Sequence, residues 1–291
     1  MRLSISTEPF SSRFSHEHSF RLIADAGFEA VDLGLFSKKD VEWLSAPDYL
    51  ERAAKVKAAL KRTGLIAGQV HAPFPSFIED DADRTRRTHA LILRSIEVTA
   101  ALSSPYVIVH PAVVPFGSAK YNDRRAMRAL NLQFYESLIP AAQELGVKVA
   151  LENMFGYDPR KKAITTCYTS DATDLADLID ELGEWTTACL DVGHSVLTGR
   201  NAAREIDLLG SRLTSLHIQG NDAVNDIHTV PYLHDALDWP EIATALRRNH
   251  YAGTYNLEVG GLFLSMPEAL LPAALRFAHA AGVLAAQAGE D

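Results

Sequence analysis

Cysteine is scarce in this 291-residue chain, where Cys167 and Cys189 are the only two. Two cysteines cannot build a disulfide scaffold or a zinc site made of thiolates, so we expect both to be packing residues. Basic residues are also outnumbered, because 28 Lys and Arg against 37 Asp and Glu give a formal net charge of −9. No overall basic field would therefore attract nucleic acid or an anionic membrane.

The chain also lacks a long apolar run and a Gly-rich phosphate-binding loop. Its first residues, MRLSISTEPF, contain no apolar signal core, and no later run approaches the roughly 18 to 20 apolar residues that span a bilayer. These features predict a cytoplasmic protein with no membrane partner. The loop TEPFSSRFS after the first predicted strand has no dinucleotide-binding glycines, which disfavours a doubly wound open sheet.

The chain does contain a regular alternation of predicted strands and helices. Eight short β-branched or apolar runs are separated by segments of helical period, most of which end near a Gly or Ser. Eight such units fit the size of a (β/α)₈ barrel, typically about 250 residues. We therefore predict α/β class and a single TIM-barrel domain over residues 1–291. The predicted strands are 2–6, 30–36, 66–71, 106–110, 147–153, 187–191, 213–218 and 254–259.

Ligand-type side chains stand at the C-terminal ends of six predicted strands. That face builds the active site of a TIM barrel, so such residues mean more there than elsewhere. Glu152 and Glu258 are the strongest candidates, because each interrupts an apolar run and a buried carboxylate needs a cation or donors beside it. Taken singly, the others also fit core, capping or loop positions, but together they predict a site. They are His71, His110, Asp191, His194, His217, Asp226 and His228.

This mixture of carboxylate and imidazole without thiolate indicates a divalent metal. It suits Mn²⁺, Zn²⁺, Co²⁺ or Fe²⁺ better than Ca²⁺, and Mg²⁺ stays among the candidates. The stretch HIQGNDAVNDIH supplies His217 as a direct metal ligand. Its other polar residues, Asn221, Asp222, Asp226 and His228, are expected to bind substrate, a further ion or the ligands themselves.

The motifs HAPF, ENM, LDVGH, HIQGND…DIH…P…LDW and NLEVG resemble, in this order, the xylose isomerase-like TIM-barrel superfamily and its sugar phosphate isomerase/epimerase branch. The resemblance covers nearly the whole chain. It implies a metal held by Glu152, Asp191, His217 and Glu258, with His194 contacting the substrate. We accordingly expect a small-molecule sugar substrate, no nucleic-acid partner, and a homodimer or homotetramer.

The same superfamily contains endonuclease IV, an abasic-site nuclease with three zinc ions, and the nine candidate side chains could supply its whole ligand set. Two features favour the sugar enzyme: the first strand-loop lacks the His and glycines of the nuclease, and DPRKK (158–162) is the only basic cluster near a strand end. The chain also departs from ketose 3-epimerases, because YLHDALDW replaces a Gly-x-Gly turn and no Arg follows His217. The sugar therefore stays open, and a catalytically silent metal-binding barrel is a third possibility.

Under the preferred hypothesis, Glu152 and Glu258 face each other across the barrel mouth, since their strands are three apart in a ring of eight. One would remove a proton next to a metal-bound carbonyl, and the other would return it. Inversion of that carbon gives epimerisation, whereas protonation of the neighbouring carbon gives isomerisation. His194 would orient a substrate oxygen, and Trp239 would begin a helix beneath the loop. Candidate aromatic wall residues are Phe10, Phe36, Phe74, Phe155 and Tyr157.

Overall fold

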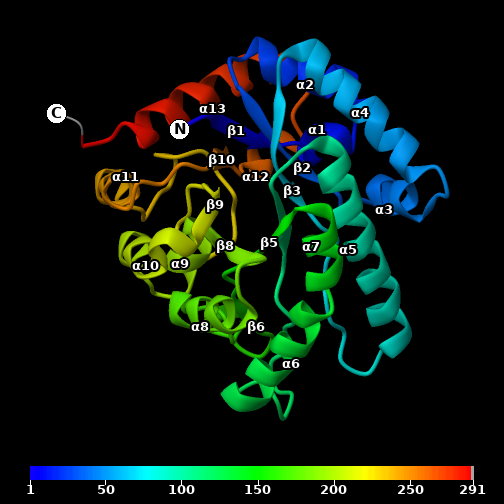
Figure 1. Cartoon of the computed structure of the whole chain (residues 1–291). Helices are drawn as coiled ribbons and strands as arrows, with labels where there is room; N and C mark the ends of the chain where they lie inside the picture. Colours follow the sequence, from blue (N-terminus) through cyan, green and yellow to red (C-terminus); the bar gives the residue numbers. More distant parts are fainter. Residues whose placement is uncertain (290–291) are drawn as a thin grey trace.

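A computed structural model describes residues 1–289 and shows a barrel of eight parallel strands with helices between them (Figure 1). The strands follow the order β10-β1-β2-β3-β4-β5-β8-β9. The ring closes between β9 and β10, where the Ile218 amide donates to the Asn256 carbonyl at 2.8 Å and the Glu258 amide donates to the Ile218 carbonyl at 2.9 Å. The predicted barrel is therefore confirmed. The strands are β1 (Leu3–Ser6), β2 (Ala30–Gly34), β3 (Ile66–His71), β4 (Tyr106–Val109), β5 (Lys148–Glu152), β8 (Thr186–Asp191), β9 (Leu213–His217) and β10 (Tyr255–Leu257).

The helices that surround the barrel begin mostly at side chains that accept a hydrogen bond from the first turn. Ser37 and Asp40 form a capping box at α3, and Asp238 accepts from the Glu241 amide at α11. Gly64 and Gly146 end α4 and α7 at φ of 75° and 66°, which glycine adopts without strain. The helices are α1 (Glu8–Ser11), α2 (His16–Asp25), α3 (Lys38–Ser45), α4 (Tyr49–Thr63), α5 (Ala82–Leu102), α6 (Arg124–Glu136), α7 (Ile139–Leu145), α8 (Ala172–Leu182), α9 (Val192–Leu197), α10 (Ala202–Leu209), η1 (Gly210–Arg212), α11 (Trp239–Arg248), α12 (Gly260–Phe263), η2 (Glu268–Leu270) and α13 (Leu271–Ala286).

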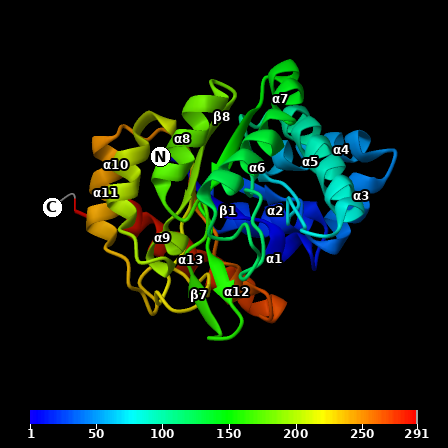
Figure 2. The same cartoon turned by 90° about the horizontal axis from the view of Figure 1, so that it is seen from below.

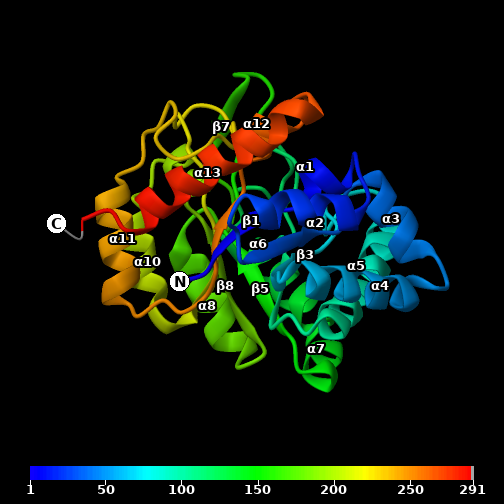
Figure 3. The same cartoon turned by 90° about the horizontal axis from the view of Figure 1, so that it is seen from above.

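One end of the barrel carries the extra structure. An antiparallel hairpin, β6 (Gly156–Asp158) with β7 (Ala163–Thr165), follows β5 and was not predicted from the sequence. The hairpin and α12 project from the same end of the barrel when the molecule is seen from below (Figure 2) and from above (Figure 3). Because α12 follows β10 and the hairpin follows β5, this end is the C-terminal mouth, where TIM barrels place their active sites.

The last helix is more apolar than the sequence analysis allowed. By length and composition alone, Glu268–Ala286 could cross a membrane, contrary to the expectation that no segment is long and apolar enough. The core helix of a soluble protein meets the same criterion, and 33% of the apolar window is buried here. Here α13 packs on the barrel against α2 and α11, and it buries Leu271, Leu275 and Ala278 completely.

The interior of the barrel is polar on one side and apolar on the other. Ile108, Ala150 and Cys189 form a small apolar cluster of their own, as expected for a packing cysteine. On the other side Ser6 donates to the Asp32 carboxylate at 3.1 Å, and Asn256 approaches the same oxygen at 3.4 Å. TIM-barrel interiors are usually filled with branched apolar residues. The buried polar groups therefore distinguish this part of the interior from an ordinary barrel core.

Candidate active site

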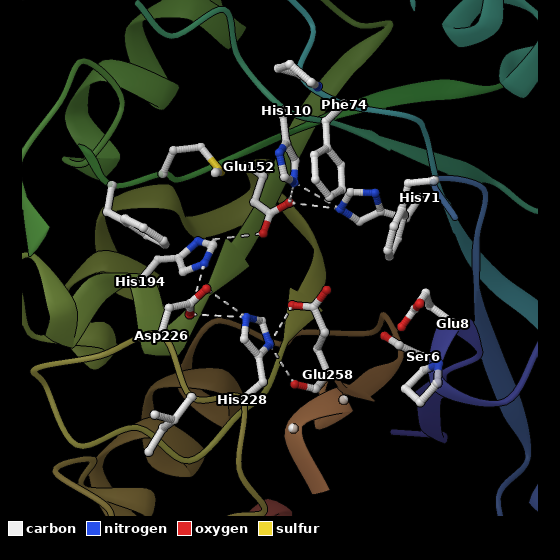
Figure 4. Close-up of a pocket in the computed structure, with 18 of the residues that line it drawn as sticks. Ser6, Glu8, His71, Phe74, His110, Glu152, His194, Asp226, His228 and Glu258 are labelled. Carbon is white, nitrogen blue, oxygen red and sulfur yellow. Dashed lines mark hydrogen bonds and ion pairs between the residues drawn. The ribbon is translucent and has the colours of Figure 1, made fainter. Parts of the chain in front are cut away.

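All nine candidate side chains meet at the C-terminal mouth of the barrel. A cavity of about 550 Å³ opens there, and Figure 4 shows the charged side chains converging on it from different strands. Asp191 and His217 are fully buried and contact residues of its lining. The other seven line the cavity: His71, His110, Glu152, His194, Asp226, His228 and Glu258.

Glu152, the last residue of β5, lies at the centre of this cluster. Its Oε1 is 2.9 Å from His217 Nδ1, while its Oε2 lies 3.1 Å from His110 Nε2 and 3.4 Å from His71 Nε2. Burial alone would raise the pKa of this carboxyl, but the charges of His217 and His110 outweigh burial and hold the pKa well below its usual range. Glu152 is therefore ionised despite its burial.

Four strand-end residues form a compact set of donors. One ligand atom from each of Glu152, Asp191, His217 and Glu258 lies within 4.8 Å of the others. Parallel pairing sets Asp191 beside His217, and Glu258 Oε2 is 3.4 Å from His217 Nδ1. Three carboxylates around one imidazole are costly to bury without a cation, and Glu152 Oε2 has no hydrogen-bond partner in the part of the chain that the structure describes. This donor set fits a divalent ion that prefers oxygen and nitrogen ligands.

Three of the histidines are oriented by backbone carbonyl groups. Nδ1 of His71 donates to Ala72 at 3.0 Å, and Nδ1 of His194 donates to Asn153 at 2.8 Å. His228 donates in the same way to the carbonyl of Glu258 at 2.9 Å. Each Nε2 consequently faces the other cluster residues, the arrangement by which ligating histidines are usually held.

These orientations create two further groups of donors. His194, Asp226 and His228 form one, in which the Asp226 carboxylate is 3.1 Å from His228 Nε2 and 3.8 Å from His194 Nε2. His71, Glu152 and His217 form the other. Eight of the nine residues, all except His110, are thus arranged as three groups, two of which share Glu152 and His217.

Protonation differs sharply across the cluster. Burial, with Glu152 and Asp191, raises the pKa of Glu258 to about 7, although His217 and His228 oppose the shift. Burial lowers the pKa of His217, but Cys189, Glu258 and Glu152 raise it well above its usual value. Two facing carboxyl groups therefore have pKa values driven apart, as in acid–base pairs of enzymes.

Asp32, on β2, is a member of this site that the sequence analysis missed. It is buried, its Oδ2 lies 3.4 Å from His217 Nε2, and its Oδ1 has no hydrogen-bond partner among residues 1–289. The imidazole of His217 thus faces Glu152 and Glu258 with Nδ1 and Asp32 with Nε2. A usable signal was present, since Asp32 interrupts the apolar run AVDLGLF as Glu152 and Glu258 interrupt theirs.

Two amides, also missed, hold Asp191 in place. Gln219 Nε2 donates to the Asp191 carboxylate at 2.9 and 3.2 Å, and its Oε1 accepts from the His228 amide at 3.1 Å. The Asn153 side chain exchanges hydrogen bonds of 2.7 and 2.9 Å with the backbone of Asp191. Asp191 also caps α9 by accepting from the His194 amide at 2.8 Å, so its capping and clustering interpretations both hold.

Some predicted contacts are absent from the cavity lining. Asn221 and Asp222 instead accept hydrogen bonds from nearby backbone amides and so shape the loop after β9. Phe10 is buried, with its ring centroid 5.0 Å from that of Phe263, and Tyr157 is 50% exposed on the hairpin. Phe36, Phe74 and Phe155 do line the cavity.

The helix predicted at Trp239 begins there. Its buried indole N–H donates to Asp235 at 2.5 Å, and Asp235 also accepts from the Tyr232 and Leu237 amides. Asp235 belongs to the segment that replaces the expected Gly-x-Gly turn. A carboxylate anchored on Trp239 therefore shapes this part of the loop.

The sequence matches the family described as xylose isomerase-like TIM barrel over residues 20–280. The chain belongs to this family. The resemblance inferred from the motifs is thereby confirmed. No curated protein matches the chain by sequence.

Solved structures of similar fold align with nearly the whole length of this family member. A D-tagatose 3-epimerase-like protein is 19% identical with a TM-score of 0.75, over 99% of this chain and 98% of that one. A D-psicose 3-epimerase from Clostridium cellulolyticum H10 is 16% identical with a TM-score of 0.75, over 98% and 99%. A 3-keto-D-glucoside 4-epimerase from E. coli is 19% identical with a TM-score of 0.73, over 96% and 99%. At such identities the likeness establishes the fold alone.

Proposed function

We propose that the chain is a divalent-metal-dependent sugar isomerase or epimerase that transfers a proton next to a carbonyl group. The observation that carries this proposal is the pair Glu152 and Glu258, which both line the cavity and share one donor set with Asp191 and His217. The sugar epimerases of similar fold add support.

The two glutamates divide the acid and base roles. Glu152 would remove the proton from the carbon beside the carbonyl, while Glu258, three strands away around the barrel, would return a proton. A divalent ion held by Glu152, Asp191, His217 and Glu258 would supply Lewis acidity at the substrate oxygens. Return of the proton to the opposite face inverts the carbon, and return to the neighbouring carbon moves the carbonyl. In both cases the substrate gains and loses one proton without net oxidation.

His194 would position a substrate oxygen during this transfer. Its Nδ1 donates to the Asn153 carbonyl, which fixes the ring, and its Nε2 lies 3.7 Å from the Asp191 carboxylate. Phe155 packs edge-on against the ring with centroids 4.9 Å apart and restricts its rotation. A ring held on two sides keeps its remaining polar edge directed at the cavity, which is the preorganisation that proton transfer requires.

The test compares Glu152→Gln and Glu258→Gln with Glu205→Gln, a buried glutamate of α10 outside the site. We expect each site variant to lose roughly 10² to 10⁴ of the rate of solvent-deuterium incorporation into ketoses and keto-inositols, measured with metal in excess. Glu205→Gln should retain that rate. Undiminished exchange in both site variants would exclude the mechanism.

A second candidate, a zinc phosphodiesterase acting on abasic DNA, draws on the two additional donor groups. It predicts three zinc ions per chain, one of which depends on His194, Asp226 and His228. The cavity speaks against it, because its lining within residues 1–289 includes neither Lys nor Arg to contact phosphates. Elemental analysis and cleavage of an abasic duplex at low salt separate the two: three zinc ions with efficient cleavage would establish the nuclease.

A further inference from the structure

The cavity has a polar floor and an apolar outer wall. Phe74 stacks on His110 with ring centroids 4.5 Å apart, and Phe36 lies 5.0 Å from both Phe74 and His71. Other apolar residues complete the circle from the loops that follow β4, β5, β9 and β10. We call this set the collar, and its members are Phe36, Phe74, Val113, Met154, Phe155, Ile227 and Leu264.

The collar leaves apolar surface uncovered at the mouth. Phe74 is 44% exposed and Leu264 is 53% exposed, although soluble proteins usually expose large apolar residues singly rather than around a cavity. The volume of about 550 Å³ also falls within the range of roughly 300–1,000 Å³ that accommodates drug-sized ligands. A single sugar ring would leave much of this space and most of the collar empty.

The polar groups of the lining are concentrated at the floor. Of the described residues outside the nine-residue cluster, only Ser6 and Glu8 contribute polar side chains to the lining, and Figure 4 shows both across the cavity from His194. Burial, with Asp40, raises the pKa of Glu8. Among the described residues, the lining contains four carboxylates and neither Lys nor Arg, so a phosphate group on the substrate would meet negative charge and have only histidines to balance it.

A free ketose matches this surface poorly. Its hydroxyl groups are spread along the whole molecule, and those facing the collar would lose water without gaining a partner. An apolar substituent in the same position would instead bury against Phe74 and Leu264. The cavity therefore selects a molecule with a polar sugar at one end and an apolar group at the other.

We infer that the substrate is an uncharged keto-glycoside whose apolar aglycone lies in the collar while its sugar ring reaches Glu152 and Glu258. This inference rests on the proposed function and names its substrate class. Because the anomeric carbon of a glycoside is bonded to the aglycone, the carbonyl must be a ketone on the ring. The glutamates then exchange the proton of a ring carbon beside that ketone, and the glycosidic bond stays intact.

The experiment compares four substrates of the metal-loaded enzyme: the phenyl glycoside of 3-keto-glucose, its methyl glycoside, free 3-keto-glucose, and 3-keto-glucose 6-phosphate. Deuterium exchange into each is followed by NMR. We expect kcat/KM for the phenyl glycoside to exceed that for the methyl glycoside about 10- to 100-fold, the effect of burying one aromatic ring. The 6-phosphate should be the poorest substrate.

Matched variants locate the effect. Leu264→Ala should lower the phenyl-to-methyl ratio several-fold, whereas Phe277→Ala, which removes an equally exposed apolar side chain from α13, should leave it unchanged. Equal kcat/KM for the phenyl and methyl glycosides, or efficient turnover of the 6-phosphate, would overturn the inference. Deuterium exchange in those same experiments would still uphold the proposed function. Absence of exchange with every ketose, keto-inositol and keto-glycoside would remove both.

Discussion

Replacing Asp32 with Asn tests how the barrel interior supports metal binding. The substitution keeps the shape of the side chain but removes the charge that lies 3.4 Å from His217 Nε2. His217 presents Nδ1 to Glu152 and Glu258, so Nε2 is the nitrogen that Asp32 can hold. A carboxylate on the far nitrogen of a ligating histidine fixes the ring and makes it a stronger donor to the metal.

Two routes give the size of the effect. A hydrogen bond to a charged group contributes about 1.5–3 kcal/mol, which corresponds to about 10- to 100-fold in affinity. Changes to residues behind a metal ligand typically cost about the same factor. Because 3.4 Å is longer than an ordinary hydrogen bond, and His217 Nε2 has no hydrogen-bond partner among the described residues, we expect a loss nearer to 10-fold than to 100-fold.

The assay is equilibrium competition between the protein and a fluorescent chelator for Mn²⁺, Co²⁺ or Zn²⁺. Asp40→Asn is the matched control, because Asp40 is equally buried but lies in the capping box of α3, outside the cavity lining. Circular dichroism and thermal unfolding verify that both variants fold. If Asp32→Asn bound metal as tightly as Asp40→Asn and the unaltered protein, the supporting role of Asp32 would be refuted.

Three further predictions concern pH and the loop after β9. Metal affinity should rise with pH, about tenfold per pH unit for each proton that the metal displaces. Below the Glu258 pKa of about 7, metal binding displaces one proton from Glu258 and one from His217, and above it only the His217 proton. The slope of log affinity against pH, measured by calorimetry, should therefore fall from near two to near one. Gly220→Ala would place Cβ 2.6 Å from the Val230 carbonyl oxygen and should cost about 1–3 kcal/mol in denaturant unfolding. Trp239→Phe removes the indole donor and should cost about 1–3 kcal/mol, a loss that thermal unfolding would reveal; an unchanged midpoint would contradict it.

The barrel and most of its site could be predicted because they depend on local patterns. Each predicted strand lies within two residues of the observed one, since short apolar runs between helical segments mark buried parallel strands. Glu152 and Glu258 could be identified because a carboxylate in an apolar run needs a partner. The hairpin β6–β7 escaped prediction because its three-residue strands have no clear alternating pattern.

Strand-end carboxylates and imidazoles could be assigned to one mouth from the sequence alone, because parallel strands in a barrel all end at the same face. Their grouping within the mouth depends instead on contacts between strands that are distant in the chain. Register pairs Asp191 with His217, barrel closure brings Glu258 to His217, and the curvature of the sheet sets Asp32 behind that ring. These contacts join residues 26 to 185 positions apart, and local propensity carries no information about such separations.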